Sequence, residues 1–175
     1  LTRAEGLLNR HRNAEAAKAF SALTTVVKTD EDRCRQRYGL GRALRKLRKW
    51  KTARGYLEEA VPICAQAEHE LAPWARHLAG KAANVRNADD VSAAHYRSQL
   101  RAHPKHRLAD DAVYHLIRHL IDDRGDMVAA ERFITEQVPL FPKGDMMADA
   151  VVYVAINAFK RKQYRRARRV LTLGE

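Results

Sequence analysis

Histidine is the residue type in this 175-residue sequence that is best suited to metal chemistry. His115 and His119 stand four residues apart on a predicted helix, and His103 and His106 precede them. Two histidines at i and i+4 can share a zinc ion, but a site needs further ligands, and the segment HLIRH carries no acidic residue between its histidines. We therefore predict no metal site and interpret these histidines as solvated or partly packed.

The two cysteines, Cys34 and Cys64, could form a disulfide. One stands at the start and the other at the end of a predicted helix pair, and in an antiparallel pair those ends meet. A bridge would close a loop of about 30 residues and stabilise the fold by roughly 3–4 kcal/mol. It would also imply an oxidising compartment. The alternative is a pair of unrelated buried thiols.

Catalytic patterns are missing from the sequence. Adjacent carboxylates on a helix point about 100° apart, so such doublets do not form a facing acid and base. The phosphate-binding, dinucleotide-binding and serine-hydrolase motifs are absent as well. We predict no catalytic residue and no cofactor. The doublets are Glu58-Glu59, Asp89-Asp90, Asp110-Asp111 and Asp122-Asp123.

The charge is strongly basic, with 33 Lys and Arg against 21 Asp and Glu and a net charge of +12. Such a charge favours anionic partners. Two basic runs lie at 42–51 and 160–169. They either form a solvent-exposed face that maintains solubility or bind an anionic partner. No apolar run reaches 18 residues, so we expect no membrane insertion. The start of the chain does not resemble a signal peptide, which fits a segment of a longer protein.

Small and apolar residues recur at a fixed spacing, which predicts a helical repeat. The segment from Cys34 to Cys64 matches the tetratricopeptide (TPR) helix hairpin, in which the small residues Gly41 and Ala53 let two backbones approach. Three columns share steps of 37, 39, 37 and 38 residues. These columns are Ala4, Gly41, Gly80, Ile117, Ala155; Ala16, Ala53, Ser92, Ala129, Ala167; and Phe20, Leu57, Tyr96, Phe133, Leu171.

The predicted fold class is all-α, a TPR-like α-solenoid of about five antiparallel helix hairpins in a single domain, 1–175. Turn signals separate paired helices, including one at Asn87 to Asp90, and first helices are expected to begin with acids near Asp110, Asp111 and Asp149. Ala150 to Phe159 is apolar almost all round, which predicts cover on both sides and further helices after Glu175. The hairpins are expected at 1–30, 31–68, 69–105, 106–143 and 144–175.

First helices line the concave surface of TPR-like arrays, and the matching columns here mix cations with aromatic residues. That mixture suits an anionic or sugar-containing polymer, through charge-assisted bonds and ring stacking. The candidate binding residues are Arg35, Tyr38, Arg42, Arg45, Lys46, Trp74, His77, Lys81, Tyr114 and Arg118.

Three segments together carry a family resemblance. CRQRYGLGRALRKLRKWKTARGYLEEAVPIC, LADDAVYHL and FPKGDMMADAVVYVAINAFKRKQYRRA resemble the helical superhelix that precedes the catalytic domain of soluble lytic murein transglycosylases. The resemblance implies a periplasmic location and peptidoglycan as the partner. It also implies a scaffold role for this segment, with a catalytic domain downstream in the same chain. No residue matches the family's catalytic glutamate.

Two other functions were considered, a scaffold for partner proteins and RNA binding. The chain could be a TPR scaffold for protein partners with no enzyme attached. RNA binding is disfavoured, because the repeats present no regular pair of base-reading side chains.

Overall fold

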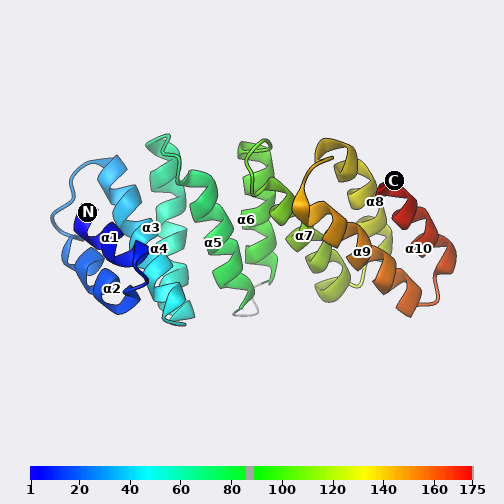
Figure 1. Cartoon of the computed structure of the whole chain (residues 1–175), viewed down its shortest axis with the longest axis horizontal. Helices are drawn as coiled ribbons and strands as arrows, with labels where there is room; N and C mark the ends of the chain where they lie inside the picture. Colours follow the sequence, from blue (N-terminus) through cyan, green and yellow to red (C-terminus); the bar gives the residue numbers. More distant parts are fainter. Residues whose placement is uncertain (86–88, 175) are drawn as a thin grey trace. The chain divides into compact units, whose positions relative to one another are not determined.

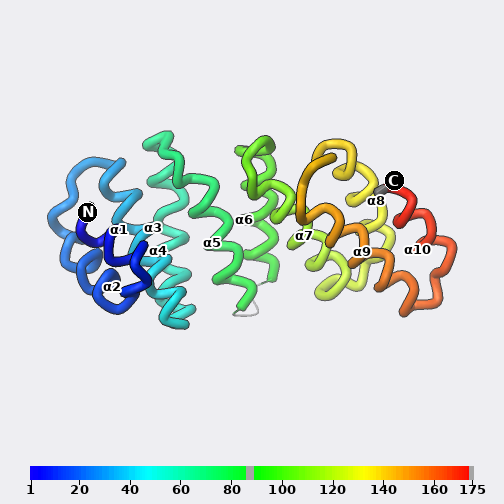
Figure 2. The backbone as a smooth tube through the Cα atoms, viewed as in Figure 1, coloured from blue at the N-terminus to red at the C-terminus, as the bar shows by residue number. Residues whose placement is uncertain are grey.

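The computed structural model describes residues 1–85 and 89–174, and within those ranges the chain is all α-helical. Ten α-helices of the described residues follow one another in antiparallel pairs (Figure 1), and the backbone trace shows the same succession (Figure 2). The helices are α1 (Thr2–Asn9), α2 (Asn13–Ala22), α3 (Asp30–Lys46), α4 (Trp50–Gln66), α5 (Ala72–Asn84), α6 (Asp89–Ala102), α7 (Ala109–Arg118), α8 (Met127–Gln137), α9 (Asp145–Lys160) and α10 (Tyr164–Leu171).

The prediction of about five antiparallel helix hairpins is confirmed, since the ten described helices form five pairs. The expected bounds were approximate, and α3 begins at Asp30, one residue before the range 31–68. The chain divides into two compact units, Leu1–His95 and Tyr96–Glu175, and the boundary falls inside α6. We call them unit 1 and unit 2. The organisation as a single domain stays a prediction.

Side chains near the helix starts explain several of the boundaries. The Thr29 hydroxyl accepts a hydrogen bond from the Asp32 amide at the start of α3, and Asp126 does the same for the Ala129 amide at α8. Asp110 lies in the first turn of α7, as expected, and its carboxylate also accepts from the Met146 amide at the start of α9. Helix α9 begins earlier than the sequence suggested, so Asp145 rather than Asp149 is its first-turn acid.

The turns inside four of the pairs share one backbone conformation. His11, Arg48 and Lys162 have φ near 59° in the turns of the first, second and fifth pairs, and Gly125 has φ of 66° in the fourth. This left-handed conformation ends a helix tightly and suits glycine best. In the fourth pair, a π-helical segment follows α7 at His119–Asp123. The predicted turn at Asn87 to Asp90 is described only in part: Asn87 lies outside the described residues, and Asp89 and Asp90 lie in the first turn of α6 rather than in a turn.

In unit 1, α3 and α4 pack closely because small residues face each other. A Cβ atom at Gly41 would stand 3.3 Å from the carbonyl oxygen of Ala53 and 2.7 Å from Cγ of Leu57, so only glycine fits there. This confirms the role predicted for Gly41 and Ala53. At the other end of the pair, Cys34 and Cys64 are joined by a disulfide, with a Cα–Cα distance of 4.8 Å, and both are fully buried.

Unit 2 has its own core, built where α7, α8, α9 and α10 meet. It combines large apolar side chains with alanines that let the helices approach, and its fully buried large residues include Val113, Ile117, Ile134, Val154 and Val170. The guanidinium groups of Arg166 and Arg169 on α10 both bond to the Glu131 carboxylate on α8, at 2.7 Å. The second helices of these two pairs are thereby held by packing inside and by ion pairs outside.

A cationic hollow on unit 1

A hollow of about 400 Å³ opens on unit 1 between α3 and α5. Cationic residues line it from α3, and apolar and aromatic residues line it from α5. Its members are Tyr38, Arg42, Arg45, Lys46, Leu71, Trp74 and Leu78, and we call this site the cationic hollow.

Helical spacing explains why these side chains converge. Positions 38, 42 and 45 follow an i, i+4, i+7 pattern on α3, so they lie along one side of the helix. Positions 71, 74 and 78 follow a similar pattern along the start of α5 and the residue before it. The buried side of the same helices carries Cys34 and Ala75, which belong to one core cluster with Tyr38 and Leu78. The disulfide therefore anchors the helix that carries the cations.

The charges in the hollow lack counter-ions. In the part of the chain that the structure describes, no carboxylate lies within ion-pair distance of Arg42, Arg45 or Lys46. The Arg45 Nε atom is buried and has no hydrogen-bond acceptor. Burial lowers the pKa of Arg45, and the neighbouring charge of Arg42 lowers it further. Arg45 and Lys46 also occupy the last turn of α3, where the helix dipole favours cations.

Tyr38 is a buried member of the lining of the hollow. Its side chain is almost fully buried, and burial raises the pKa of its hydroxyl, an effect that Arg42 and Arg45 oppose. The hydroxyl therefore stays protonated at neutral pH and lies near two cations. An anion in the hollow would meet guanidinium donors on one side and the ring of Trp74 on the other.

Five of the ten predicted binding residues come together in this site. They are Tyr38, Arg42, Arg45, Lys46 and Trp74. Leu71 and Leu78 were not predicted, although their spacing of three and four residues from Trp74 places them on its side of α5 and could have indicated them.

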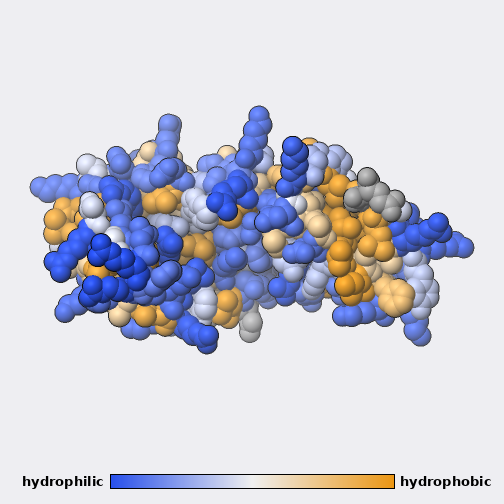
Figure 3. All heavy atoms as spheres, viewed as in Figure 1, coloured by the Kyte–Doolittle hydropathy of each residue, from blue (hydrophilic) through white to orange (hydrophobic). Residues whose placement is uncertain are grey.

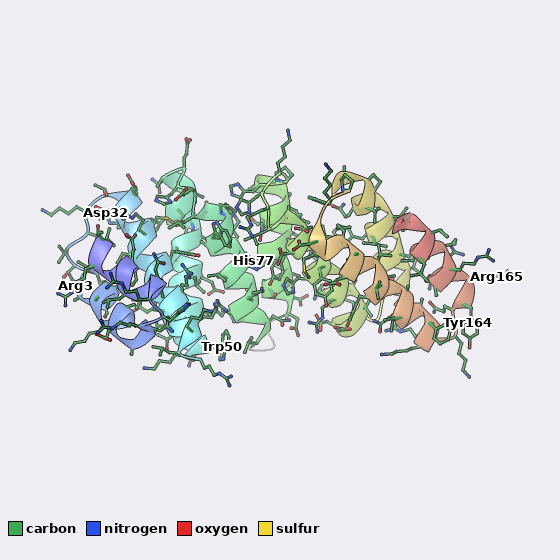
Figure 4. The ribbon with its side chains drawn as sticks, in the orientation of Figure 1. Arg3, Asp32, Trp50, His77, Tyr164 and Arg165 are labelled. Atoms are coloured by element: carbon green, nitrogen blue, oxygen red, sulfur yellow. A yellow bond between two sulfur atoms is a disulfide. The ribbon has the colours of Figure 1, made fainter. Side chains whose placement is uncertain are left out.

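Three more candidates from unit 1 lie outside the hollow. Arg35 forms a two-pronged ion pair with Glu5 of α1, at 2.8 and 2.9 Å, which neutralises its charge. His77 lies on α5 (Figure 4). It is only 3% exposed, so it does not present a surface for a ligand. Lys81 is half-buried farther along the same helix and does not line the hollow.

The last two candidates, Tyr114 and Arg118, belong to unit 2. The Arg118 guanidinium bonds to Asp122 at 3.3 Å and lies over the ring of Tyr153, 5.8 Å from its centre. The Tyr153 hydroxyl donates to Asp122 at 2.6 Å, and burial together with this carboxylate raises the Tyr153 pKa. Because Asp122 compensates Arg118, this cluster is not a second site of uncompensated positive charge.

Two of the histidines considered for metal binding, His115 and His119, have partners within the fold. His115 stacks on the ring of Tyr96, with centres 4.6 Å apart, and His119 bonds to Asp123 at 2.9 Å. Among the described residues, no group of three metal-ligating side chains comes together. In the same ranges, no helix has the length and apolar character to cross a bilayer.

Comparison with solved structures identifies the fold, whereas comparison with family models and curated sequences finds no match. No protein-family model and no curated protein matches the chain. Among solved structures, a Podosopora anserina chain assigned to the kinesin light chains, with nearly identical TPR-like repeats, matches with a TM-score of 0.73 and 15% identity. It covers 99% of this chain and 90% of that one.

Two further structures support the same assignment. A double mutant of MamA RS-1 matches with a TM-score of 0.74 and 14% identity, over 99% of this chain and 89% of that one. The apo form of RapI matches with a TM-score of 0.56 and 12% identity, over 98% and 78%. None of these similarities links the chain to lytic transglycosylases. What they show is the fold: the chain is an all-α protein of the TPR-like helical-repeat class.

Proposed function

We propose that this protein is a binding scaffold whose cationic hollow holds an acidic segment of a partner protein. The observation that carries the proposal is the group Arg42, Arg45 and Lys46, which has no counter-ion among the described residues, with the buried Arg45 Nε aimed at no acceptor. An incoming carboxylate would supply the counter-charge that Arg42, Arg45 and Lys46 lack among the described residues, through charge-assisted hydrogen bonds to their accessible nitrogens.

The apolar half of the hollow adds a second requirement for the ligand, which is an apolar or aromatic group. Leu71, Trp74 and Leu78 stand opposite the cations, so an acidic residue next to an apolar or aromatic one would fit both halves. Charged hydrogen bonds give direction, while the ring and aliphatic groups supply buried area. A peptide that alternates acidic and apolar side chains satisfies these conditions.

Peptidoglycan is the second candidate, as implied by the resemblance to lytic transglycosylases. Its muramyl carboxylates could meet Arg42 and Arg45, and a sugar face could stack on Trp74. Under that hypothesis this chain holds glycan strands for an enzyme rather than a partner protein. A periplasmic location is part of our proposal, supported by the buried Cys34–Cys64 disulfide.

One binding experiment separates the two candidates. A fluorescent peptide rich in Glu and Leu, and labelled soluble glycan strands, are titrated with the protein at low and physiological salt. We expect the peptide to bind, and the charge-reversal variant Arg42→Glu/Arg45→Glu to weaken it by at least about tenfold. Preferential binding of glycan strands, lost in the same variant, would favour the peptidoglycan hypothesis.

The matched control is Lys18→Glu/Lys51→Glu. These lysines are exposed on α2 and α4 of the same unit and lie outside the hollow, and the variant makes the same change in net charge. It should change affinity by no more than about twofold, as expected for long-range electrostatics under salt screening. Equal losses in the two variants would show that net charge, and not the hollow, drives binding.

A further inference from the structure

A small pocket of about 270 Å³ opens in unit 2 between α6, α7 and α8. Its base is apolar. Leu116 of α7 is buried, and Leu120 and Phe133 are half-buried and pack against the core of the unit. We call this site the α6–α8 pocket. Because its base belongs to the packed interior, the fold sets its shape.

The α6–α8 pocket is separate from the apolar surface near the end of the described chain. That surface lies over α9 and α10, where Ile156 and Leu171 are exposed (Figure 3). Helices α7 and α8, in contrast, pack against α9 through the core of unit 2. The pocket is therefore a feature of helices that already have packing partners.

Three charged side chains form the rim of the α6–α8 pocket. Arg97 comes from α6, whereas Arg132 and Glu136 come from α8, where a spacing of four residues places them on one side of the helix. All three are exposed. In the part of the chain that the structure describes, none of the three forms an ion pair. The rim therefore offers two cationic groups and one anionic group to a ligand.

Nearby carboxylates are engaged elsewhere. Glu131 of α8 pairs with two arginines of α10, and Asp122 and Asp123 bond to other side chains of unit 2. Among the described residues, Glu136 is the one acidic group that lines the pocket. The charges of the rim are therefore set by Arg97, Arg132 and Glu136.

The π-helical segment that follows α7 contributes to the base of the pocket. It covers His119–Asp123, and its Leu120 lines the pocket. The side chains of His119 and Asp123, at the two ends of the segment, bond to each other at 2.9 Å. Such π-helical turns are rare and occur frequently at functional sites. This observation is independent of the charges on the rim and points to the same place.

We propose that the α6–α8 pocket binds a small zwitterion with an apolar side chain, namely a free apolar α-amino acid such as leucine. Its carboxylate would accept hydrogen bonds from Arg97 and Arg132, and its ammonium group would donate to Glu136. Its side chain would contact Leu116 and Leu120. The volume lies just below the range of about 300–1,000 Å³ that holds drug-sized ligands, which suits a molecule of this small size.

Other classes of ligand fit the rim less well. A simple anion would meet repulsion from Glu136, and a simple cation would meet repulsion from the two arginines. An internal residue of a peptide carries neither of the two charges next to its side chain. The site is on unit 2, so it stands independently of the cationic hollow on unit 1.

The test compares leucine with two molecules of nearly the same shape. Leucinamide lacks the charge of the carboxylate, and the hydroxy acid analogue of leucine lacks the ammonium group. Each is titrated into isotope-labelled protein while NMR follows the backbone amides. We expect leucine to bind with a Kd of about 1 mM or lower and to shift the amides of Leu116, Leu120 and Phe133. Each analogue should bind at least about fivefold more weakly, because it loses one charged contact.

Two variants assign the charged contacts. Arg132→Gln should reduce the preference for leucine over leucinamide, and Glu136→Gln should remove the preference for leucine over the hydroxy acid. Arg101→Gln on α6 and Glu70→Gln in unit 1 are the matched controls, because they alter exposed residues outside the pocket and make the same changes in net charge. The controls should change the affinity for leucine by no more than about twofold.

Four results would overturn the proposal. They are no binding of leucine at about ten times the expected Kd, shifts confined to other helices, equal binding of the three ligands, and tighter binding of the hydroxy acid than of leucine. The two proposed sites also fail separately. Arg42→Glu/Arg45→Glu should bind leucine as the wild type does, and Glu136→Gln should keep its affinity for the acidic Leu-rich peptide.

Discussion

Gly41 of α3 lies directly against the Leu57 side chain of α4, so closely that a Cβ atom on Gly41 would come within 2.7 Å of the leucine Cγ. Leu57 is fully buried and cannot swing into solvent. The contact sets the separation of the two longest helices of unit 1, one of which carries Arg42 and Arg45.

The first prediction follows from this contact. Gly41→Ala should lower the free energy of unfolding by about 1–3 kcal/mol, because the new methyl group must displace a packed leucine. Gly55→Ala is the control, since a methyl group added there would have no side chain and no other helix within 4 Å, and α4 is helical at that position. The control should raise stability by up to about 1 kcal/mol. Urea unfolding measures both, and an unchanged Gly41→Ala protein would contradict the packing described.

The second prediction concerns the disulfide. Cys34 and Cys64 are separated by 30 residues, so replacing both by alanine should cost about 3–4 kcal/mol in the free energy of unfolding. Chemical denaturation of the oxidised wild type and of the double variant measures the difference. Intact mass after alkylation without reductant supplies the control, because a bridged protein takes up no label. Full labelling of both thiols in unreduced, denatured protein would show that the bridge does not form.

The third prediction concerns the turn between α3 and α4. Arg48 has φ of 59°, a conformation that costs a residue with a Cβ atom about 1–2 kcal/mol relative to its usual backbone. Arg48→Gly should therefore raise stability by roughly 0.5–1 kcal/mol, after the extra freedom of glycine in the unfolded chain is subtracted. Lys51→Gly, in the first turn of α4, should instead lower it by up to about 1 kcal/mol. Thermal unfolding of the two variants should therefore shift in opposite directions.

The fourth prediction is a pH dependence from His95 on α6. Burial lowers the pKa of His95 below its ordinary value of 6.5. The nearby carboxylate of Glu58 raises this pKa, and the charges of Arg54 and Arg76 lower it further. The unfolded chain therefore binds a proton at this residue more readily than the folded protein does. Its contribution to stability is present above pH 6.5 and is lost as pH falls through the folded pKa.

His95→Gln cannot titrate and isolates this contribution. Between about pH 7.5 and pH 5.5, the melting temperature of the wild type should fall more than that of the variant. The other histidines are the same in both proteins and cancel in the comparison. Parallel pH profiles for the two proteins would show that His95 does not carry the effect.

Much of the fold was predictable from local residue patterns. The recurring columns through Gly41, Ala53 and Leu57 predicted five helix pairs, and the positions of Cys34 and Cys64 predicted which helix ends meet. Such features are readable because each depends on neighbours within one hairpin, where helical spacing alone sets which side chains face each other. The start of α9 was placed too late, because the first-turn acid is Asp145, directly after Gly144.

The candidate site could be predicted only in part. The repeat columns placed ten residues on the predicted concave surface. They could not show that Glu5 compensates Arg35 or that Asp122 compensates Arg118. Nor could they show that His77 is buried. Each of these depends on a partner or a packing helix contributed by another part of the fold. Only the three-dimensional structure shows that no carboxylate of the described residues lies close enough to compensate the charges of Arg42 and Arg45.

The sequence alone therefore determined the helical repeat, the pairing within each hairpin and the excess of positive charge. The tertiary structure decided where that charge remains without a partner, in the cationic hollow, and where apolar surface remains uncovered, on the side of α9 that carries Ile156. The physical reason is that periodicity is a property of one helix, whereas charge compensation and burial are properties of contacts between helices that are distant in sequence.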